Sequence, residues 1–430
     1  MRDAIGIGGV RGIGAWVAIG VLAGAACAQP EAATPYIARH LYDHSLHAEP
    51  VLLHRIDGSM MTYTDARGLL RRAPTSEFLV VLPAPSQIEP VHPDGDAPEG
   101  VVTLVDGQRY TGRALATPDA DEPPLLWHAP FGTIRLALEH VASVARLGAE
   151  APSASGEGED RVRLSNGDTL TGFLLEIGER VAIETAAGEV DVPFAAVSWA
   201  RIANPPVEPR GVMVWLDDGT VARVEILPQA TPDALETRVL LPGAEEGTSA
   251  AIGVRTEDES APVNTGPRLS IPVASIRALV FDASRLVGLG ELDLVGVRSD
   301  RPWPPSVGFS NTDANPLGAP DITLPVPLSA SWALPPRAER VAFEASLPER
   351  SRIWGDAMLV LTVEQDQGAA ELGRFHLHAG SPTASVNVPI PLPEDPRRDR
   401  RLRVDFLGGD SGPAQDAVVL RYPLVLLGPE

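Results

Sequence analysis

The feature that most restricts the fold is a motif that recurs four times: an Asx-Gly pair between two runs of alternating apolar residues. The pairs are Asp57-Gly58, Asp106-Gly107, Asn166-Gly167 and Asp218-Gly219. Asx-Gly adopts the positive φ angles of a tight hairpin at little steric cost. A phosphate-binding loop would need Gly-Lys-Ser/Thr leading into a helix, whereas a strand-like run, "TLTGFLL", follows Asn166-Gly167. The motif therefore predicts a repeated β-hairpin.

The repeated units also share an ending. In the third and fourth units a strand runs into Pro193 or Pro272, and after a short turn Val197 or Ile276 opens a last strand. Proline at a strand end stops the hydrogen-bonded ladder without leaving an unpaired donor. Each unit is thus expected to be a small antiparallel barrel of five strands. The units resemble Sm-like barrels of exported bacterial proteins.

The first 28 residues have the pattern of a secretory signal peptide. Arg2 and Arg11 give a positively charged start, and an apolar run from Ile13 to Ala26 follows. Ala26-Cys27-Ala28 fits a cleavage site. We expect an exported mature chain that begins at Gln29 and has no transmembrane segment. A lipoprotein anchored at Cys27 is the alternative, and periplasm, cell surface and medium stay open.

Composition excludes several kinds of chemistry. Cys27 is the only cysteine, and the chain has no lysine, because all 35 basic residues are arginine. The mature chain thus lacks a thiol nucleophile, a cysteine-ligated zinc, a phosphate-loop lysine and a Schiff base. The net charge of −22 would repel nucleic acid, including the RNA that Sm barrels often bind. Carbohydrate or a cell-envelope protein is the expected partner.

From about residue 285 the apolar runs become longer and alternate, as in "RVAFEASL" and "MLVLTVEQ", which predicts a β-sandwich. The whole chain is therefore expected to be all-β, with repeated five-stranded barrels followed by a jelly roll. The expected order is a signal peptide (1–28), a short helix with the first barrel (29–93), the second barrel (94–150), a linker (151–160), the third barrel (161–204), the fourth barrel (205–283) and the sandwich (285–430). The fourth barrel is expected to contain a polar insertion at roughly 228–267.

The C-terminal third resembles NPCBM modules, a family to which carbohydrate binding is attributed. Pro302-Trp303-Pro304 leads into a turn with Asp313, Asn315 and Gly318, as in that family. The resemblance covers roughly 285–428 and implies a galactose-binding-type jelly roll. Two features depart from the family: "LPVPLSASWAL" replaces its glycine-rich second strand, and the tryptophan before its last strand is missing.

The candidate ligand-binding residues lie in loops of this sandwich. They are Trp303, Asn311, Asp313, Asn315 and Trp354. A tryptophan offers an apolar plane to the C–H face of a sugar, and Asx groups bind hydroxyls. Calcium at the alternating Asx residues is an alternative, but Gly318 comes too late for an EF-hand loop. Trp332 lies inside an alternating strand and is expected in the core.

Two groups of histidines and one serine-containing loop are candidate functional sites, and each also has a simpler structural explanation. His40, His44 and His47 would share one face of the expected helix "YIARHLYDHSLH", and His376 and His378 would share a strand face. Metal binding there competes with a solvated polar surface. "GGDSGP" (408–413) is similar to a serine-protease loop but lacks an oriented base, which favours a polar turn.

The sequence as a whole favours an exported, non-catalytic binding protein without a metal or cofactor, whose sandwich recognises carbohydrate. The alternative is a structural or assembly protein of the cell envelope that uses its barrels for protein contacts. The sequence leaves the ligand and the oligomeric state open.

Overall fold

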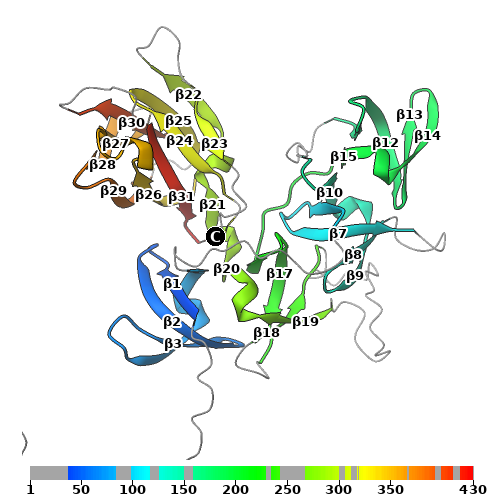
Figure 1. Cartoon of the computed structure of the whole chain (residues 1–430), viewed down its shortest axis with the longest axis horizontal. Helices are drawn as coiled ribbons and strands as arrows, with labels where there is room; N and C mark the ends of the chain where they lie inside the picture. The colour runs from blue at the N-terminus through cyan, green and yellow to red at the C-terminus, as the bar shows by residue number, and fades with distance from the viewer. Residues whose placement is uncertain are drawn as a thin grey trace, which may run out of the picture. The chain divides into compact units, whose positions relative to one another are not determined.

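The computed structural model describes residues 37–83, 98–116, 125–149, 158–228, 234–242, 267–299, 306–310, 317, 319–365, 368–392, 399–409 and 417–429. Over these residues the chain is all-β: it contains strands and short 3₁₀ turns but no α-helix. The predicted fold class is confirmed (Figure 1). The predicted signal peptide lies outside the described residues.

Four successive segments have the same strand pairing. In each, the first strand pairs antiparallel with the second and the fifth, the second with the third, and the third with the fourth. This order wraps five strands around one apolar interior, which gives a small barrel. The likeness to Sm barrels specifically stays a prediction.

The strands of the first two barrels are β1 (Ile37–Asp43), β2 (Ala48–Asp57), β3 (Met60–Thr64), β4 (Leu70–Pro74), β5 (Phe78–Pro83), then β6 (Gly100–Leu104), β7 (Arg109–Leu115), β8 (Leu125–Ala129), β9 (Gly132–Leu136), β10 (Val141–Arg146). Those of the third and fourth are β11 (Asp160–Leu164), β12 (Thr169–Ile177), β13 (Arg180–Thr185), β14 (Gly188–Pro193), β15 (Val197–Arg201), then β16 (Val212–Leu216), β17 (Val221–Ile226), β18 (Ala234–Val239), β19 (Arg268–Pro272), β20 (Ile276–Val280).

The shared ending of the units is a 3₁₀ turn that leads into the last strand. The turns are η1 (Thr75–Glu77), η3 (Leu138–His140), η4 (Phe194–Ala196) and η5 (Val273–Ser275). The prolines predicted to stop strands do end β14 and β19, at Pro193 and Pro272. Their missing N–H groups cost the ladder nothing at this point.

Glycine at two kinds of position makes the barrels possible. Gly167 in the third hairpin has φ +95°, the conformation expected of the Asx-Gly turn. Gly172, five residues later, lets β12 pass close to its neighbour, because a Cβ there would lie 2.0 Å from the Glu184 carbonyl oxygen. Gly112 has the same role on β7, where a Cβ would lie 2.1 Å from the His128 oxygen.

The helix predicted within residues 29–48 is wrong over its described part. Residues Ile37–Asp43 form β1, which pairs with both β2 and β5 and so closes the first barrel. Leu41 on this strand is 1% exposed and Arg39 is 4% exposed. Alternate residues therefore face the interior, and strand pairing decides the conformation over the helical spacing of the histidines.

Two predicted boundaries also shift. The linker ends earlier than expected, because Asp160 already belongs to β11. The polar insertion of the fourth barrel contains β18 (Ala234–Val239), which pairs with β17 and β19. Alternating burial along β18, with Leu235, Thr237 and Val239 inside, explains why this segment is a strand.

The barrels join through their strands. The last strands of the first and fourth barrels pair at Val81 and Leu279, and those of the second and third pair at Val144 and Ala200. The second and fourth barrels meet where β7 pairs with β17 at Arg109 and Val221. All twenty strands consequently belong to one hydrogen-bonded network.

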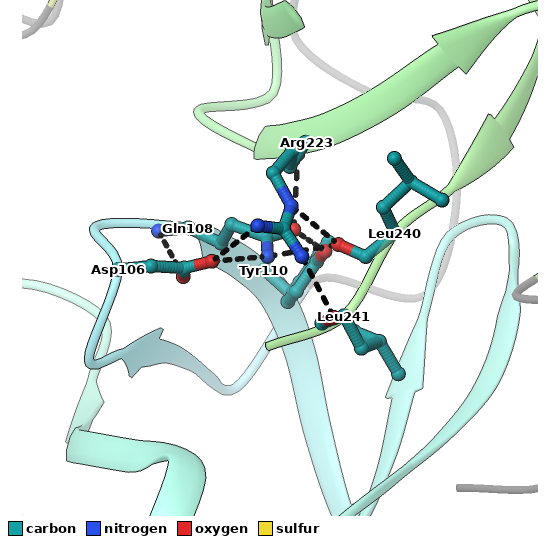
Figure 2. Close-up of polar contacts among 6 residues, drawn as sticks. All are labelled: Asp106, Gln108, Tyr110, Arg223, Leu240 and Leu241. Carbon is teal, nitrogen blue, oxygen red and sulfur yellow. Dashed lines mark hydrogen bonds and ion pairs between the residues drawn. The ribbon is translucent and has the colours of Figure 1, made fainter. Parts of the chain in front are cut away.

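A buried polar network fills the joint between the second and fourth barrels (Figure 2). The Arg223 guanidinium donates to the carbonyl oxygens of Leu240 (3.4 Å) and Leu241 (2.8 Å), and its backbone N–H donates to Gln108 Oε1 (2.9 Å). The Gln108 amide donates to Asp106 Oδ2 at 2.9 Å, and Arg223 lies 4.0 Å from the same carboxylate oxygen. Burial raises the pKa of nearby Tyr110. The network is satisfied within the protein, which marks it as structural.

The C-terminal segment is a β-sandwich of two sheets. One sheet has the order β23-β24-β31-β26-β29, with β21 beside β31, and the other has β22-β25-β30-β27-β28. Its strands are β21 (Leu286–Gly288), β22 (Leu294–Arg298), β23 (Gly308–Ser310), β24 (Asp321–Pro325), β25 (Leu328–Leu334), β26 (Ala338–Ser346), β27 (Asp356–Gln365), β28 (Gly368–His378), β29 (Thr383–Pro389), β30 (Arg400–Gly408) and β31 (Ala417–Leu427). Trp332 and Phe406, both 0% exposed, lie in the core, as predicted for Trp332.

The first barrel contacts the sandwich at the turn between β1 and β2. Leu46 at this turn is 3% exposed and packs in one cluster with Leu426. The Asn387 side-chain amide donates to the carbonyl oxygens of Ser45 (3.1 Å) and Leu46 (2.9 Å). His44 Nε2 donates to Ser76 O at 2.8 Å.

Candidate functional site

The candidate site lies where β27 begins and β28 ends, and it is called the Trp354 edge. It comprises Ile353, Trp354, Asp356, His376 and His378. Trp354 and Ile353 occupy the loop before β27, and their side chains are 80% and 73% exposed. A tryptophan buried this little contributes almost nothing to the core, so its exposed indole is available to a ligand.

The loop that presents Trp354 has a defined backbone. After the 3₁₀ turn η8 (Glu349–Ser351), the Trp354 and Gly355 N–H groups both donate to Ser351 O, at 3.2 and 2.6 Å. Gly355 is required here, because a Cβ would lie 2.7 Å from Leu347 Cδ1 and 2.8 Å from Ser351 O. The backbone beside the indole is thus fixed before any ligand arrives.

The polar part of the edge comes from the β27–β28 hairpin. Register places Asp356 opposite His378 and Met358 opposite His376. The Asp356 carboxylate lies 2.6 Å from His376 Nε2, with 13% and 48% of the two side chains exposed. His376 and His378 point to the same side of β28, and their ring centroids are 4.8 Å apart. The shared strand face predicted for the two histidines is therefore observed.

Hydrogen bonds orient both imidazole rings. Asp356 accepts from His376 Nε2–H, which leaves His376 Nδ1 as the second polar atom of that ring. His378 Nδ1 accepts from the Gly380 backbone N–H at 3.1 Å, so His378 Nε2 carries the proton in the neutral ring. The cluster consequently offers both a donor and an acceptor, and Trp354 lies two residues before Asp356 in the chain.

The second residue of the "GGDSGP" segment, Gly409, packs against this carboxylate. Gly409 N–H donates to the Asp356 carbonyl oxygen at 2.8 Å, and a Cβ on Gly409 would lie 1.9 Å from Asp356 Oδ1. A glycine is needed here because the Asp356 side chain occupies the space of a Cβ. Residues 410–413 lie outside the described residues.

Most of the predicted ligand-binding residues cannot be placed. Trp303, Asn311, Asp313 and Asn315 lie outside the described residues, and so does Gly318. Trp354 is therefore the one predicted binding residue that the structure places, in an exposed loop. The structure tests neither a common site with Trp303 nor a calcium loop.

The histidines near the N-terminus do not form the predicted helical face. His40 lies on β1, whereas His44 and His47 lie in the turn between β1 and β2. Burial lowers the pKa of His40, and the His44 ring bonds Ser76 O and Arg285. Within the part of the chain that the structure describes, no group of three or more His, Cys, Asp or Glu side chains has a geometry that could hold a metal ion.

Sequence reasoning missed Asp356 and Ile353. Counting back from the pairing of Gln365 with Gly368 would place Asp356 opposite Leu377, and a β-bulge between Leu361 and Thr362 shifts it opposite His378. The exposure of Ile353 had no sequence signal, because a single apolar residue in a loop is equally compatible with burial.

No helix over the described ranges is long and apolar enough to cross a membrane.

No protein-family model and no curated protein matches the chain. Solved structures similar to it include CBM51 from Clostridium perfringens GH95 in complex with methyl-galactose, with 12% identity, a TM-score of 0.24 and coverage of 33% of this chain and 99% of that one. CBM51-2 with INT domains from Clostridium perfringens ZmpB, in complex with GlcNAc, has 8% identity, a TM-score of 0.26 and coverage of 56% and 44%. The insecticidal delta-endotoxin Cry8Ea1 from Bacillus thuringiensis has 9% identity, a TM-score of 0.22 and coverage of 92% and 53%. With TM-scores this low, the proposals below rest on the chain's own side chains.

Proposed function

We propose that this chain is an exported, non-catalytic binding protein whose sandwich recognises a neutral carbohydrate at the Trp354 edge. The observation that carries the proposal is the 80% exposed indole of Trp354, which lies two residues before the aspartate of the Asp356–His376–His378 cluster. An exposed aromatic plane beside oriented donors and acceptors suits the C–H faces and hydroxyl groups of a sugar.

The rigidity of the edge supports binding by a preformed surface. The loop backbone is held at Ser351, and Asp356 is held by His376 and packed against Gly409. A ligand would therefore need to order little of the protein, which leaves more of its interaction energy for affinity. One ring and one polar cluster form a small site, which favours a terminal sugar over a long chain.

Charge favours a neutral ligand. The chain carries a net charge of −22, and Asp356 adds a carboxylate to the edge itself. An anionic glycan would meet this field unfavourably, whereas hydroxyl groups can accept from the imidazole N–H and donate to the carboxylate.

A glycan array probed with the mature full chain tests the proposal. We expect binding to neutral glycans, and Trp354→Ala should reduce the affinity about fivefold or more, because a contact with an aromatic ring is worth on the order of 1 kcal/mol. Phe173→Ala is the matched control, since Phe173 is a 66% exposed aromatic residue on β12, away from the sandwich strands.

The same glycan array can also refute the proposal. If the wild-type protein binds no glycan, or if Trp354→Ala and Phe173→Ala bind equally well, the Trp354 edge is not a carbohydrate site. A catalytic role would appear separately, as cleavage products released from a bound glycan.

A second function, assembly through the barrels, is favoured by a different observation. Phe173 and Leu175 on β12 are 66% and 38% exposed, and Leu69, just before β4, and Leu70, its first residue, are 51% and 68% exposed. Apolar side chains that gather on a surface mark protein contacts. Light scattering of the wild type and of Phe173→Ser tests this role: a larger species that Phe173→Ser converts to monomer would support assembly.

A further inference from the structure

The outer face of the first barrel exposes leucine side chains beside arginines, and it is called the basic face. Strand register places Leu52, Thr64 and Leu70 in one row across β2, β3 and β4. Residues directly opposite each other in antiparallel strands point to the same side of the sheet, so the two leucines share this face. Leu52 is 38% exposed and Leu70 is 68% exposed.

Positive charge borders these leucines. Arg72 lies two residues after Leu70 on β4 and therefore points to the same side, and Arg67 is exposed in the turn between β3 and β4. Within the described residues neither of these arginines has a carboxylate within ion-pair distance, whereas Arg71 pairs with Asp65 at 2.9 Å. The basic face thus carries positive charge that no described side chain balances.

The outer face of the third barrel has the opposite charge, and it is called the acidic face. Register places Phe173, Glu184 and Glu189 in one row across β12, β13 and β14. Phe173 is 66% exposed, and both glutamates are exposed. Over the ranges that the structure describes, neither glutamate lies within ion-pair distance of an arginine, whereas Asp191 on the same sheet pairs with Arg180 at 2.6 Å.

The apolar residues of both faces point away from the barrel cores. Leu174 and Ile183 fill the interior of the third barrel from β12 and β13, and Met61 does so in the first barrel from β3. Leu70 and Phe173 lie on the opposite sides of these sheets and contact solvent. Covering them would remove apolar area from water, which favours association. The unbalanced charges beside them have opposite signs, so the two faces complement each other.

We infer that the acidic face of one copy of this chain docks on the basic face of a second copy, so that Phe173 meets the leucines and the two glutamates meet Arg72. The inference rests on the assembly role proposed above for the barrels, whose partner it names, and it does not depend on carbohydrate binding. The two faces differ, so the contact is head-to-tail and produces a ring or an open chain of copies. Pairing two acidic faces with each other would instead bring glutamates of both copies together, which is costly.

The net charge of −22 on each copy is compatible with this contact. At physiological ionic strength, repulsion between exposed charges is screened beyond about 8 Å. Ion pairs across the contact form within about 4 Å, where screening is weaker. The local charges of the two faces therefore decide whether they bind.

Charge reversal on each face tests the inference in sedimentation experiments on the mature full chain at about 0.15 M salt. The wild type should self-associate as its concentration rises. Arg72→Glu and Glu184→Arg should each shift association to at least about tenfold higher concentration, because each variant places like charges in contact. An equal mixture of the two variants should contain complexes of two chains and nothing larger, since one intact face remains on each.

Two features control for the overall charge. Arg298→Glu makes the same charge change as Arg72→Glu at an exposed arginine of β22 in the sandwich, and it should associate like the wild type. Glu184→Arg makes the chain less negative, so general repulsion cannot explain a loss of association in that variant. Circular dichroism should match the wild type in all three variants, because the replaced side chains are exposed.

The inference and the assembly role can fail separately. If Phe173→Ser is monomeric but Arg72→Glu associates like the wild type, the inference is overturned and the assembly role stands. If the mixture of Arg72→Glu and Glu184→Arg stays monomeric, the inference is overturned as well. A wild type that is monomeric over the whole dilution series would overturn both.

Discussion

The joint between the second and fourth barrels and the Trp354 edge are built from similar side chains and have opposite exposure. The joint combines Asp106, Tyr110 and Arg223, which are 2%, 0% and 7% exposed. The edge combines an aspartate, an aromatic residue and two histidines, and there Trp354 is 80% exposed. The first set is closed to solvent, and the second is open to it.

This difference separates stabilising from binding roles. In the joint every strong donor finds an acceptor inside the protein, as Arg223 does at Leu240 and Leu241. At the edge, Asp356 binds His376 Nε2, while the Trp354 indole contacts solvent. Substitutions in the joint should therefore change the free energy of unfolding, and substitutions at the edge should change affinity.

The two tryptophans of the sandwich give the largest contrast. Trp332→Ala should lower the free energy of unfolding by about 4 kcal/mol, because the 0% exposed indole would leave a cavity in the core. Trp354→Ala should change it by less than about 0.5 kcal/mol, as expected of a surface residue. Urea denaturation measures both, and equal losses would mean that Trp354 is part of the core.

Arg223→Met tests the closed character of the joint. We expect a loss of about 3 kcal/mol, because Asp106 would remain buried without its cation and two carbonyl oxygens would lose a donor. Arg238→Met is the control: Arg238 pairs with half-exposed Glu225 at 2.8 Å, and such a pair is worth about 1 kcal/mol at most. Glycan binding should not change in either variant, and a lost affinity in Arg223→Met alone would contradict the separation of roles.

The sequence predicts the barrels well because their determinants are local. An Asx-Gly turn, alternating side chains and a proline at the strand end lie within one unit, and they identify the hairpin at Asn166-Gly167 directly. The joint is different, since Gln108 and Arg223 are 115 residues apart and nothing near either residue indicates the other. Long-range contacts of this kind need the structure.

The errors near the N-terminus and at the edge have related physical causes. His40, His44 and His47 repeat at helical spacing, but burial of Arg39 and Leu41 and pairing with two strands make the segment β1. At the edge, Trp354 could be chosen from its residue type. The position of Asp356 opposite His378 depends on a one-residue register shift between Leu361 and Thr362, which the alternation of side chains does not indicate.

Gly409→Ala should have an intermediate effect on both the free energy of unfolding and the affinity for glycans. The added methyl would lie 1.9 Å from Asp356 Oδ1, so the carboxylate must move away from His376. We expect a loss of about 1–2 kcal/mol in the free energy of unfolding and weaker glycan binding. Gly296→Ala is the control, because the nearest atom to its added Cβ is 4.0 Å away. Full affinity in Gly409→Ala would show that Asp356 takes no part in binding.

The smallest expected effect concerns Asp65, a carboxylate of the first barrel whose acceptors are used by its own turn. The backbone N–H of Leu69 donates to it at 2.9 Å, and so do Arg71 Nε and the Arg67 N–H. These bonds, first of all the one from Leu69, hold the pKa of Asp65 below its usual value. Because the folded-state pKa is the lower one, the stabilisation is present above about pH 4, the pKa of an unfolded aspartate, and is lost as pH falls through the folded-state pKa. Asp65→Asn should therefore be slightly less stable than the wild type at neutral pH, and the two Tm values should converge as the solution is acidified below pH 4. Parallel Tm curves down to the lowest pH would contradict this role. Glycan affinity should stay unchanged, because a carboxylate that is satisfied inside its own turn has nothing left to offer a ligand.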